Sequence, residues 1–513
     1  MPIDYVPNDP RASKFNTART QPAIANRPAK SAQLRIANLP KQSPYPVGTK
    51  EWLAWQVRES SYRALAVFEK IDGPLAKWPR SSDFKTLEVV LVLGNQANAY
   101  YDGHKLVFCQ VRKAGKLHYT GASTDVVAHE TGHAILDALR PDLWSSKYLE
   151  VAAFHESFAD CIALLAALAD TDIRRDLARP KVLDKLNYVE TWGEQLAWLA
   201  GPGNSPRHAL NKLTWHMPTA NDEFHDFGQI FTGCFYDLIR LLFAAAKTKN
   251  EKTLWNATKK AAQLLFSAVR KAPDTPRYFQ ALGRVMDIES AGDASLQAAT
   301  RAAFAAHGFM LGSAAILSPK SRLAGAIVSA PRNRWVPSDD AITDLRGRTG
   351  LKTSVPIELR ALQLGGRELI EASYPRTINI TGLGADYLEG VQAITPEGVL
   401  LGRLSMAPAI RALTPADKES VAIMSALPDS VATENEVMEF VGSLVRSNQI
   451  APAPNRARHF SAISAIATDL SPEEDDEALA HVTHQVVETP DGGRVLERLR
   501  FACQCRAHKK LGA

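Results

Sequence analysis

The chain has 513 residues, of which 45% are apolar and 22% charged, and its formal net charge is +5 at pH 7. This length exceeds what one hydrophobic core usually supports, so we expect two or three domains of an ordinary globular protein. The net charge is small for the length, which argues against a nucleic-acid-binding function.

The opening residues carry no recognisable targeting segment. Residues 1–15 contain no apolar stretch of signal-peptide length, and the longest apolar run, residues 161–168, is expected to be a buried helix rather than a membrane span. The five cysteines are odd in number and scattered, which argues against a disulfide framework. These features predict a cytoplasmic protein, or one exported by a route without a standard signal peptide.

The first part of the chain is predicted to contain strands before helices. Residues 1–48 are rich in Pro, Ala, Asn and basic side chains, and are predicted to form an extended basic arm. Residues 51–70 predict a helix and residues 87–93 a buried strand. Residues 98–108 predict a second extended pair that turns at Asp102-Gly103. From Asp125 to about Phe309 the pattern is helical, so residues 49–315 are predicted to form an α+β domain with a β-rich lobe and a helical lobe.

The last part of the chain has a different pattern. Residues 316–513 are assigned to a separate accessory region, mixed or rich in β structure, whose function the sequence does not reveal. Two hairpins are predicted in it, one turning at Pro396-Glu397-Gly398 and one at residues 490–493, together with a helix over residues 434–445.

The central motif is His129-Glu130-Thr131-Gly132-His133. On a helix, residues four apart lie on the same face, so the two imidazoles can reach one metal ion from adjacent turns. Ser123 and Asp125 supply capping and dipole-matched groups at the start of this helix, and Arg140-Pro141 ends it.

A second helical segment completes the motif with Glu156, which lies in Phe154-His155-Glu156-Ser157-Phe158-Ala159-Asp160. Catalytic zinc commonly takes three protein ligands and leaves a fourth position open, so His129, His133 and Glu156 are the predicted ligands of one zinc ion. Asp160 lies four residues after Glu156 on the same face, where it could accept the other ring N–H of a ligand histidine.

With these motifs the chain resembles the thermolysin-like zinc metallopeptidases, the gluzincins, over roughly residues 50–315. Asn98-Ala99-Tyr100-Tyr101-Asp102-Gly103 is similar to the family's substrate-binding edge strand and turn, and residues 224–231 are similar to the segment whose histidine stabilises the oxyanion. The resemblance implies a zinc cleft between the two lobes. It also implies that Asn98 and Ala99 bind substrate backbone, and that His225 donates to the oxyanion.

The chain departs from the family pattern at several positions. The family's tyrosine, a second oxyanion donor, corresponds either to Tyr148 or to the position of Trp144, and only Tyr148 offers a phenol. The residue that would correspond to the family's substrate-binding arginine is Arg207. Asp125 matches a calcium ligand, but its acidic partner on the Glu156 helix is missing, which argues against a structural calcium. Members are normally secreted with a long propeptide, which 48 residues cannot encode. We therefore expect the chain to be active without self-cleavage.

The residues together predict a zinc metalloendopeptidase, with peptides or proteins as substrates and Glu130 as the general base. Two other classes of function remain open. The first is a peptidase-like module that binds peptides and cuts them weakly or not at all. The second is an effector or structural component delivered by a specialised export machine, with a protein partner for the arm or the C-terminal region.

Overall fold

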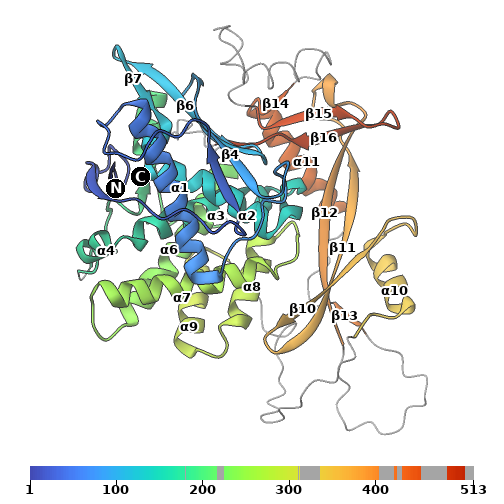
Figure 1. Cartoon of the computed structure of the whole chain (residues 1–513). Helices are drawn as coiled ribbons and strands as arrows, with labels where there is room; N and C mark the ends of the chain where they lie inside the picture. The colour runs from blue at the N-terminus through green and yellow to red at the C-terminus, as the bar shows by residue number, and fades with distance from the viewer. Residues whose placement is uncertain are drawn as a thin grey trace.

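The structure, a computed structural model, describes residues 1–179, 181–215, 224–309, 311, 335–403, 421–423, 430–451 and 482–502. It is a mixed α+β fold with several sheets, as the sequence predicts (Figure 1). Helices dominate residues 124–306, and a second large sheet lies in the C-terminal region.

The first large sheet has the strand order β17-β5-β6-β4-β3, with β7 paired to β6. Its strands are β3 (Gln33–Ile36), β4 (Thr86–Asn95), β5 (Ala99–Tyr101), β6 (Lys105–Lys113), β7 (Lys116–Tyr119) and β17 (Phe501–Ala502). The predicted strand over 87–93 and the pair over 98–108 are confirmed, since β5 and β6 are antiparallel around the turn at Asp102. There the Asp102 carboxylate accepts from the backbone N–H groups of His104 and Lys105.

The helical part is built around α2 (Thr124–Leu139) and α3 (Leu149–Ala169), which pack closely against each other. The Ser123 hydroxyl caps α2 by accepting from the Val126 N–H, and α2 ends at Arg140, before Pro141, as predicted. The predicted first helix is confirmed as α1 (Lys50–Asp72). The remaining elements here are α4 (Thr171–Leu177), α5 (Glu194–Ala200), α6 (Phe224–Ala245), α7 (Glu251–Val269), α8 (Tyr278–Glu289), α9 (Ala294–Ala306), β8 (Thr191–Trp192), β9 (Arg207–His208) and the short helices η1 (Thr120–Ala122) and η2 (Pro141–Ser145).

Two helices, α3 and α6, are long and apolar enough by composition to cross a membrane. In the structure the apolar window of α3 is 100% buried and that of α6 67% buried, as is common for core helices. Composition alone therefore does not decide the matter, and the absence of a membrane span stays a prediction.

Gly132 sets how closely α2 approaches α3. A Cβ built on it would lie 2.7 Å from the Ala159 Cα, a backbone atom that cannot move aside easily. We therefore expect Gly132→Ala to separate the helices and to destabilise the fold by about 1–3 kcal/mol through overpacking. Gly347→Ala is the matched control, because Gly347 lies in α10 (Asp339–Thr349) with open space around it. Chemical denaturation measures both, and equal stabilities for the two variants would contradict the packing argument.

Residues 1–48 do not form a detached arm. They contain β1 (Pro2–Tyr5) and β2 (Arg19–Pro22), which pair with each other, and β3, which joins the first large sheet. Ile3 and Tyr5 are buried, and the Asn8 side chain donates to the Tyr188 carbonyl. The segment lacks helix or strand periodicity because a continuous run, residues 5–9, is buried against the following domain, while most of residues 13–31 are at least partly exposed.

The C-terminal region contributes a seven-stranded sheet, seen on the right of Figure 1. Its elements are β10 (Glu358–Leu364), β11 (Arg367–Asn379), β12 (Val391–Arg403), β13 (Val421–Ile423), β14 (Ile450–Ala451), β15 (His484–Glu488), β16 (Arg494–Arg498), α10, α11 (Ser430–Arg446) and η3 (Asp386–Leu388). The predicted hairpin at residues 490–493 is confirmed as the antiparallel pair β15 and β16, and the predicted helix as part of α11.

The hairpin predicted at Pro396-Glu397-Gly398 is wrong. The strand β12 runs through these residues without a turn and pairs with β11 along its length. Tertiary contacts hold it extended: the Gly398 N–H donates to the Asp274 carbonyl, and the Thr395 hydroxyl accepts from the Lys147 N–H. These bonds also join the C-terminal region to the helical part.

Candidate metal centre

Two helices bring His129, His133 and Glu156 together. The two imidazole Nε2 atoms are 3.1 Å apart, and the Glu156 carboxylate lies 3.4 Å from His129 Nε2 and 3.7 Å from His133 Nε2. All three side chains are at most 1% exposed. The predicted ligand set is therefore a real cluster in the structure, since these atoms lie close enough to share one metal ion.

The distances fit a tetrahedral ion. With metal–ligand bonds of about 2.0–2.1 Å, two ligand atoms at a tetrahedral centre are about 3.3–3.4 Å apart. The observed separations of 3.1–3.7 Å bracket this value. Both Glu156 oxygens lack a hydrogen-bond partner in the described structure although they are buried, a state that is costly unless a cation or another donor meets them. The donor set thus suits zinc.

Asp160 orients the first ligand, as predicted. Its Oδ1 lies 2.8 Å from His129 Nδ1, so Nδ1 carries the proton and the Nε2 lone pair faces the cluster. Arg207 donates to the same oxygen at 2.8 Å, and Thr232 on α6 donates to Oδ2 at 3.4 Å. Burial lowers the pKa of His129, but the hydrogen bond to Asp160 and the neighbouring Glu156 carboxylate outweigh it and raise this pKa to about 9 in the metal-free chain.

Glu130 lies beside the cluster but outside the ligand set. It is fully buried, and neither of its oxygens has a hydrogen-bond partner in the described structure. Burial raises the pKa of Glu130 to about 8, against the attraction of His129 and with the repulsion of Glu156. A carboxyl group with this pKa can exchange a proton near neutral pH, which is what a general base requires.

His225 in the first turn of α6 reaches the same centre. Its Nε2 lies 3.4 Å from the nearer Glu156 oxygen. This approach depends on Gly228, because a Cβ there would lie 2.9 Å from the Ala153 carbonyl oxygen and 3.0 Å from the Glu156 Cβ. The structure therefore brings together His225 and the ligand set, which are 69 or more residues apart along the chain.

Tyr148 is not part of this centre. The side chain is fully buried, and the charges that act on its hydroxyl belong to Glu397, Asp274 and Arg376, none of which touches the ligand set. Two of these three residues, Arg376 and Glu397, belong to the C-terminal region, so the Tyr148 hydroxyl lies on that side of α3. Its predicted role as a second oxyanion donor is therefore unsupported. Burial raises the pKa of Tyr148 well above its ordinary value.

Of the predicted substrate-binding residues, Arg207 lies at the centre, and Asn98 and Ala99 lie at the start of β5. Ala99 is buried on β5, and Asn98, just before that strand, is also buried. Arg207 is buried against Asp160, so the structure shows it first as a partner of the ligand shell. The substrate contacts of all three stay predictions.

Sequence analysis missed three residues that lie at this centre. The Phe501 ring stacks on His133 at 4.8 Å between ring centroids and on His155 at 4.0 Å. The Ala502 carbonyl accepts from His225 Nε2 at 2.8 Å, and Arg498 lies in the electrostatic field of Glu156. No local pattern could have found them, because they are more than 340 residues from the zinc motif.

A second group of acids could also hold a cation. The side-chain oxygens of Asp9, Asp125 and Glu194 lie within 4.8 Å of one another, and one oxygen of each has no hydrogen-bond partner in the described structure. The sequence argument against calcium considered only the α3 helix, whereas the fold supplies Asp9 and Glu194 from elsewhere. Burial raises the pKa of all three groups, and that of Glu194 reaches about 8, although backbone hydrogen bonds and Arg11 oppose the shift at Asp9.

This acidic group predicts a stability that depends on pH and on calcium. Its folded-state pKa values lie above those of the unfolded chain, so the fold binds extra protons and loses stability as pH rises from about 4 towards 8. In zinc-saturated protein at pH 8, added Ca²⁺ should replace those protons and raise Tm by several degrees. Asp125→Asn should reduce both the pH effect and the calcium effect. An unchanged Tm in the wild type on calcium addition would exclude a calcium site here.

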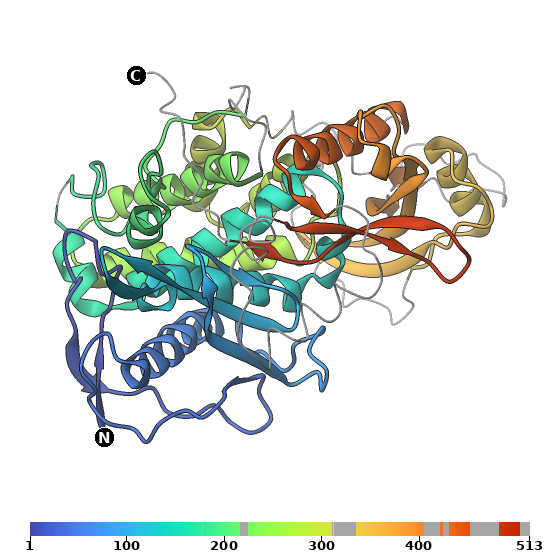
Figure 2. The ribbon, with the colours of Figure 1, turned by 90° about the horizontal axis from the view of Figure 1, so that it is seen from above.

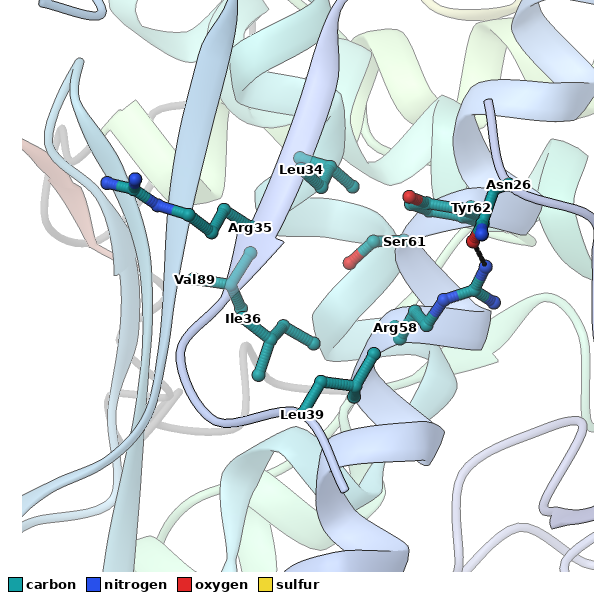
Figure 3. Close-up of a pocket in the computed structure, with 9 residues that line it drawn as sticks. All are labelled: Asn26, Leu34, Arg35, Ile36, Leu39, Arg58, Ser61, Tyr62 and Val89. Carbon is teal, nitrogen blue, oxygen red and sulfur yellow. Dashed lines mark hydrogen bonds between the residues drawn. The ribbon is translucent and has the colours of Figure 1, made fainter. Parts of the chain in front are cut away.

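A separate cavity of about 220 Å³ lies between α1, β3 and β4 (Figure 3). On one side of it the Arg58 guanidinium donates to Asn26, and Leu34 and Val89 line the other side. Among the described residues, no His, Cys, Asp or Glu lines this cavity.

Comparisons with known proteins add no assignment. No protein-family model matches the chain. A search of curated proteins also finds no match.

Proposed function

We propose that this protein is a zinc-dependent peptidase that hydrolyses peptide bonds at the cluster of His129, His133 and Glu156. The observation that carries the proposal is the tetrahedral spacing of these three ligand atoms next to Glu130, a buried carboxylate without a hydrogen-bond partner in the described structure. The two-lobed gluzincin architecture is part of the same proposal.

The ligand residues and their supports would hold the ion in place. When bound, zinc would supply a Lewis acid that polarises a carbonyl and lowers the pKa of water towards ~7. Asp160, held by Arg207, bonds to His129 Nδ1 and so leaves Nε2 to face Glu156 and His133, where it would hold the ion. The burial of the cluster keeps bulk water away and strengthens every charge interaction within it.

Two side chains would act on the substrate. Glu130 would accept a proton from the attacking water and pass it to the leaving nitrogen. His225 Nε2 would donate a hydrogen bond to the oxygen that becomes negative as the carbonyl carbon is attacked. Losing one such donor typically costs about 3 kcal/mol of transition-state stabilisation.

The alternative of a binding module keeps one observation in its favour, the position of Tyr148. The charges that act on its hydroxyl belong to Glu397 and Asp274, so among the described residues Tyr148 does not supply the second oxyanion donor that the family resemblance implied. A centre with His225 alone would hydrolyse more slowly but could still bind peptides.

Metal analysis combined with a peptide-library cleavage profile tests the proposal. Purified wild type and Phe501→Ala, whose smaller side chain opens the space above His133, should each contain one zinc and cleave peptides. The cleavage profile would also define the side-chain preference. Zinc-loaded protein that cleaves no peptide in either form, and binds peptides instead, would favour the binding module.

A further inference from the structure

The last described strand lies on the edge that is predicted to receive substrate. The strand β17 pairs antiparallel with β5, with Phe501 opposite Tyr101 and Ala502 opposite Tyr100. It therefore runs towards Ala99 and Asn98, the predicted substrate-binding positions. Figure 2 shows this red end of the described chain reaching the blue sheet. Strand addition of this kind is how many proteins bind extended peptides.

The Ala502 carbonyl lies at the catalytic centre. Its oxygen is 2.8 Å from His225 Nε2, and the same nitrogen is 3.4 Å from the nearer oxygen of Glu156. His225 is the proposed oxyanion donor, so the carbonyl group that it holds is in the place of the group to be attacked.

Side chains on both sides hold this strand in register. The Phe501 ring stacks on His133 and His155 and meets Trp144 edge-on at 5.3 Å. Behind it the Arg498 guanidinium lies 4.1 Å from the centre of the Phe501 ring. Arg500 anchors the strand by lying 4.6 Å from the centre of the Tyr100 ring and donating to the Val482 carbonyl. These contacts prevent β17 from shifting its register along β5.

We propose that this strand is the chain's own substrate and that the peptide bond following Ala502 is cleaved within the same molecule, an inference that rests on the proposed peptidase function. A water oxygen bonds to the Ala502 carbonyl carbon while Glu130 accepts the water's proton. The C–N bond to Cys503 then breaks, and its nitrogen takes that proton. The products are a chain ending in the Ala502 carboxylate and the peptide of residues 503–513, with water as the only co-reactant.

The strand β17 fills the edge of β5 and the space above His133, so an added peptide must displace it. Cleavage after Ala502 leaves Phe501 and Ala502 on the shortened chain, so the edge becomes free only when that shortened strand leaves β5. The proposal differs from the prediction, made from the short N-terminal segment, that the chain is active without self-cleavage.

Intact mass measured over time on zinc-loaded full-length protein tests the cleavage. The wild type should lose residues 503–513 at a rate that does not depend on protein concentration. Glu130→Gln should cleave at least ~10²-fold more slowly because it cannot accept the proton. Cys503→Pro should stay intact because proline places a rigid ring, without an N–H, at the attacked bond. Cleavage of Glu130→Gln chains by added wild type at the same rate would overturn the intramolecular step.

Hydrogen exchange on metal-free protein tests the strand placement without any turnover. The amides of adjacent strand residues point to opposite sides, so one of Tyr100 and Tyr101 donates towards β17 and the other towards β6. The amide that faces β17 should exchange slowly in the wild type and at least tenfold faster in Phe501→Ala, while the amide that faces β6 stays protected in both. Equal exchange in the two proteins would overturn the placement.

If added peptides are cleaved while residues 503–513 stay attached, the self-cleavage is wrong and the peptidase function stands. If Phe501→Ala cleaves neither its own chain nor added peptides, the peptidase function fails as well.

Discussion

Glu130→Gln is expected to lower the rate of peptide hydrolysis by at least ~10²-fold while zinc content and fold are kept. Gln has nearly the shape of Glu and can still form hydrogen bonds, but it cannot accept a proton. Glu130 is buried and follows His129 directly in the motif, so the substitution changes the proposed base without touching the ligand set. The measurement is the initial rate on a peptide found in the library profile, together with zinc content and circular dichroism.

The matched control for this substitution is Glu51→Gln. Glu51 is an exposed residue in the first turn of α1, so the same chemical change there should leave the rate unchanged. Equal rates in wild type and Glu130→Gln would show that hydrolysis occurs with a different base. The assignment of the proton transfer to Glu130 would then have to be withdrawn.

Removing a metal ligand should have the second large effect. Glu156→Ala is expected to lose most of its zinc, because two imidazoles alone leave the ion with one protein ligand fewer than catalytic sites normally use. The substitution also leaves His129 without one of the two carboxylates that hold it. Zinc content after dialysis against a weak chelator measures the loss. Hydrolysis should fall with it, since both depend on the same centre.

Asp160→Asn provides a graded comparison for the ligand variant. Outer-shell partners of metal ligands typically contribute 10–100-fold in metal affinity, so zinc binding should weaken by roughly that factor rather than be lost. Asn keeps the side-chain shape and can still accept from His129 Nδ1, but it removes the charge that Arg207 balances. Full zinc occupancy in Glu156→Ala would refute the ligand assignment, and an unchanged affinity in Asp160→Asn would refute the role of Asp160.

The predicted ligand set, His129, His133 and Glu156, could be recognised from the sequence because it depends on the spacing of residues within two helices. Four-residue spacing on a helix fixes that His129 and His133 face the same side, and the same rule relates Glu156 to Asp160. A single tertiary contact, the packing of α2 on α3, then brings the two histidines next to Glu156 and Asp160. The glycine inside the motif, Gly132, is what permits that packing distance.

Predictions that relied on a single local signal were less secure. Pro396 and Gly398 favour a turn, but pairing with β11 and the bond to Asp274 keep β12 extended. Spacing to a family position suggested Tyr148, yet a side chain at the start of a helix can face either neighbouring layer. The packing of the C-terminal region against η2 and α3 decided its direction.

By itself the sequence determined the α+β class and the clustering of His129, His133 and Glu156, because each depends on residue type and on spacing within one or two helices. Only the tertiary structure decided what surrounds them. The contact of Asp9 with Asp125, the bond from Arg207 to Asp160, and the strand of Phe501 and Ala502 against His133 and His225 all join distant segments. Such contacts are set by how whole layers pack, and no periodicity within a short window records them.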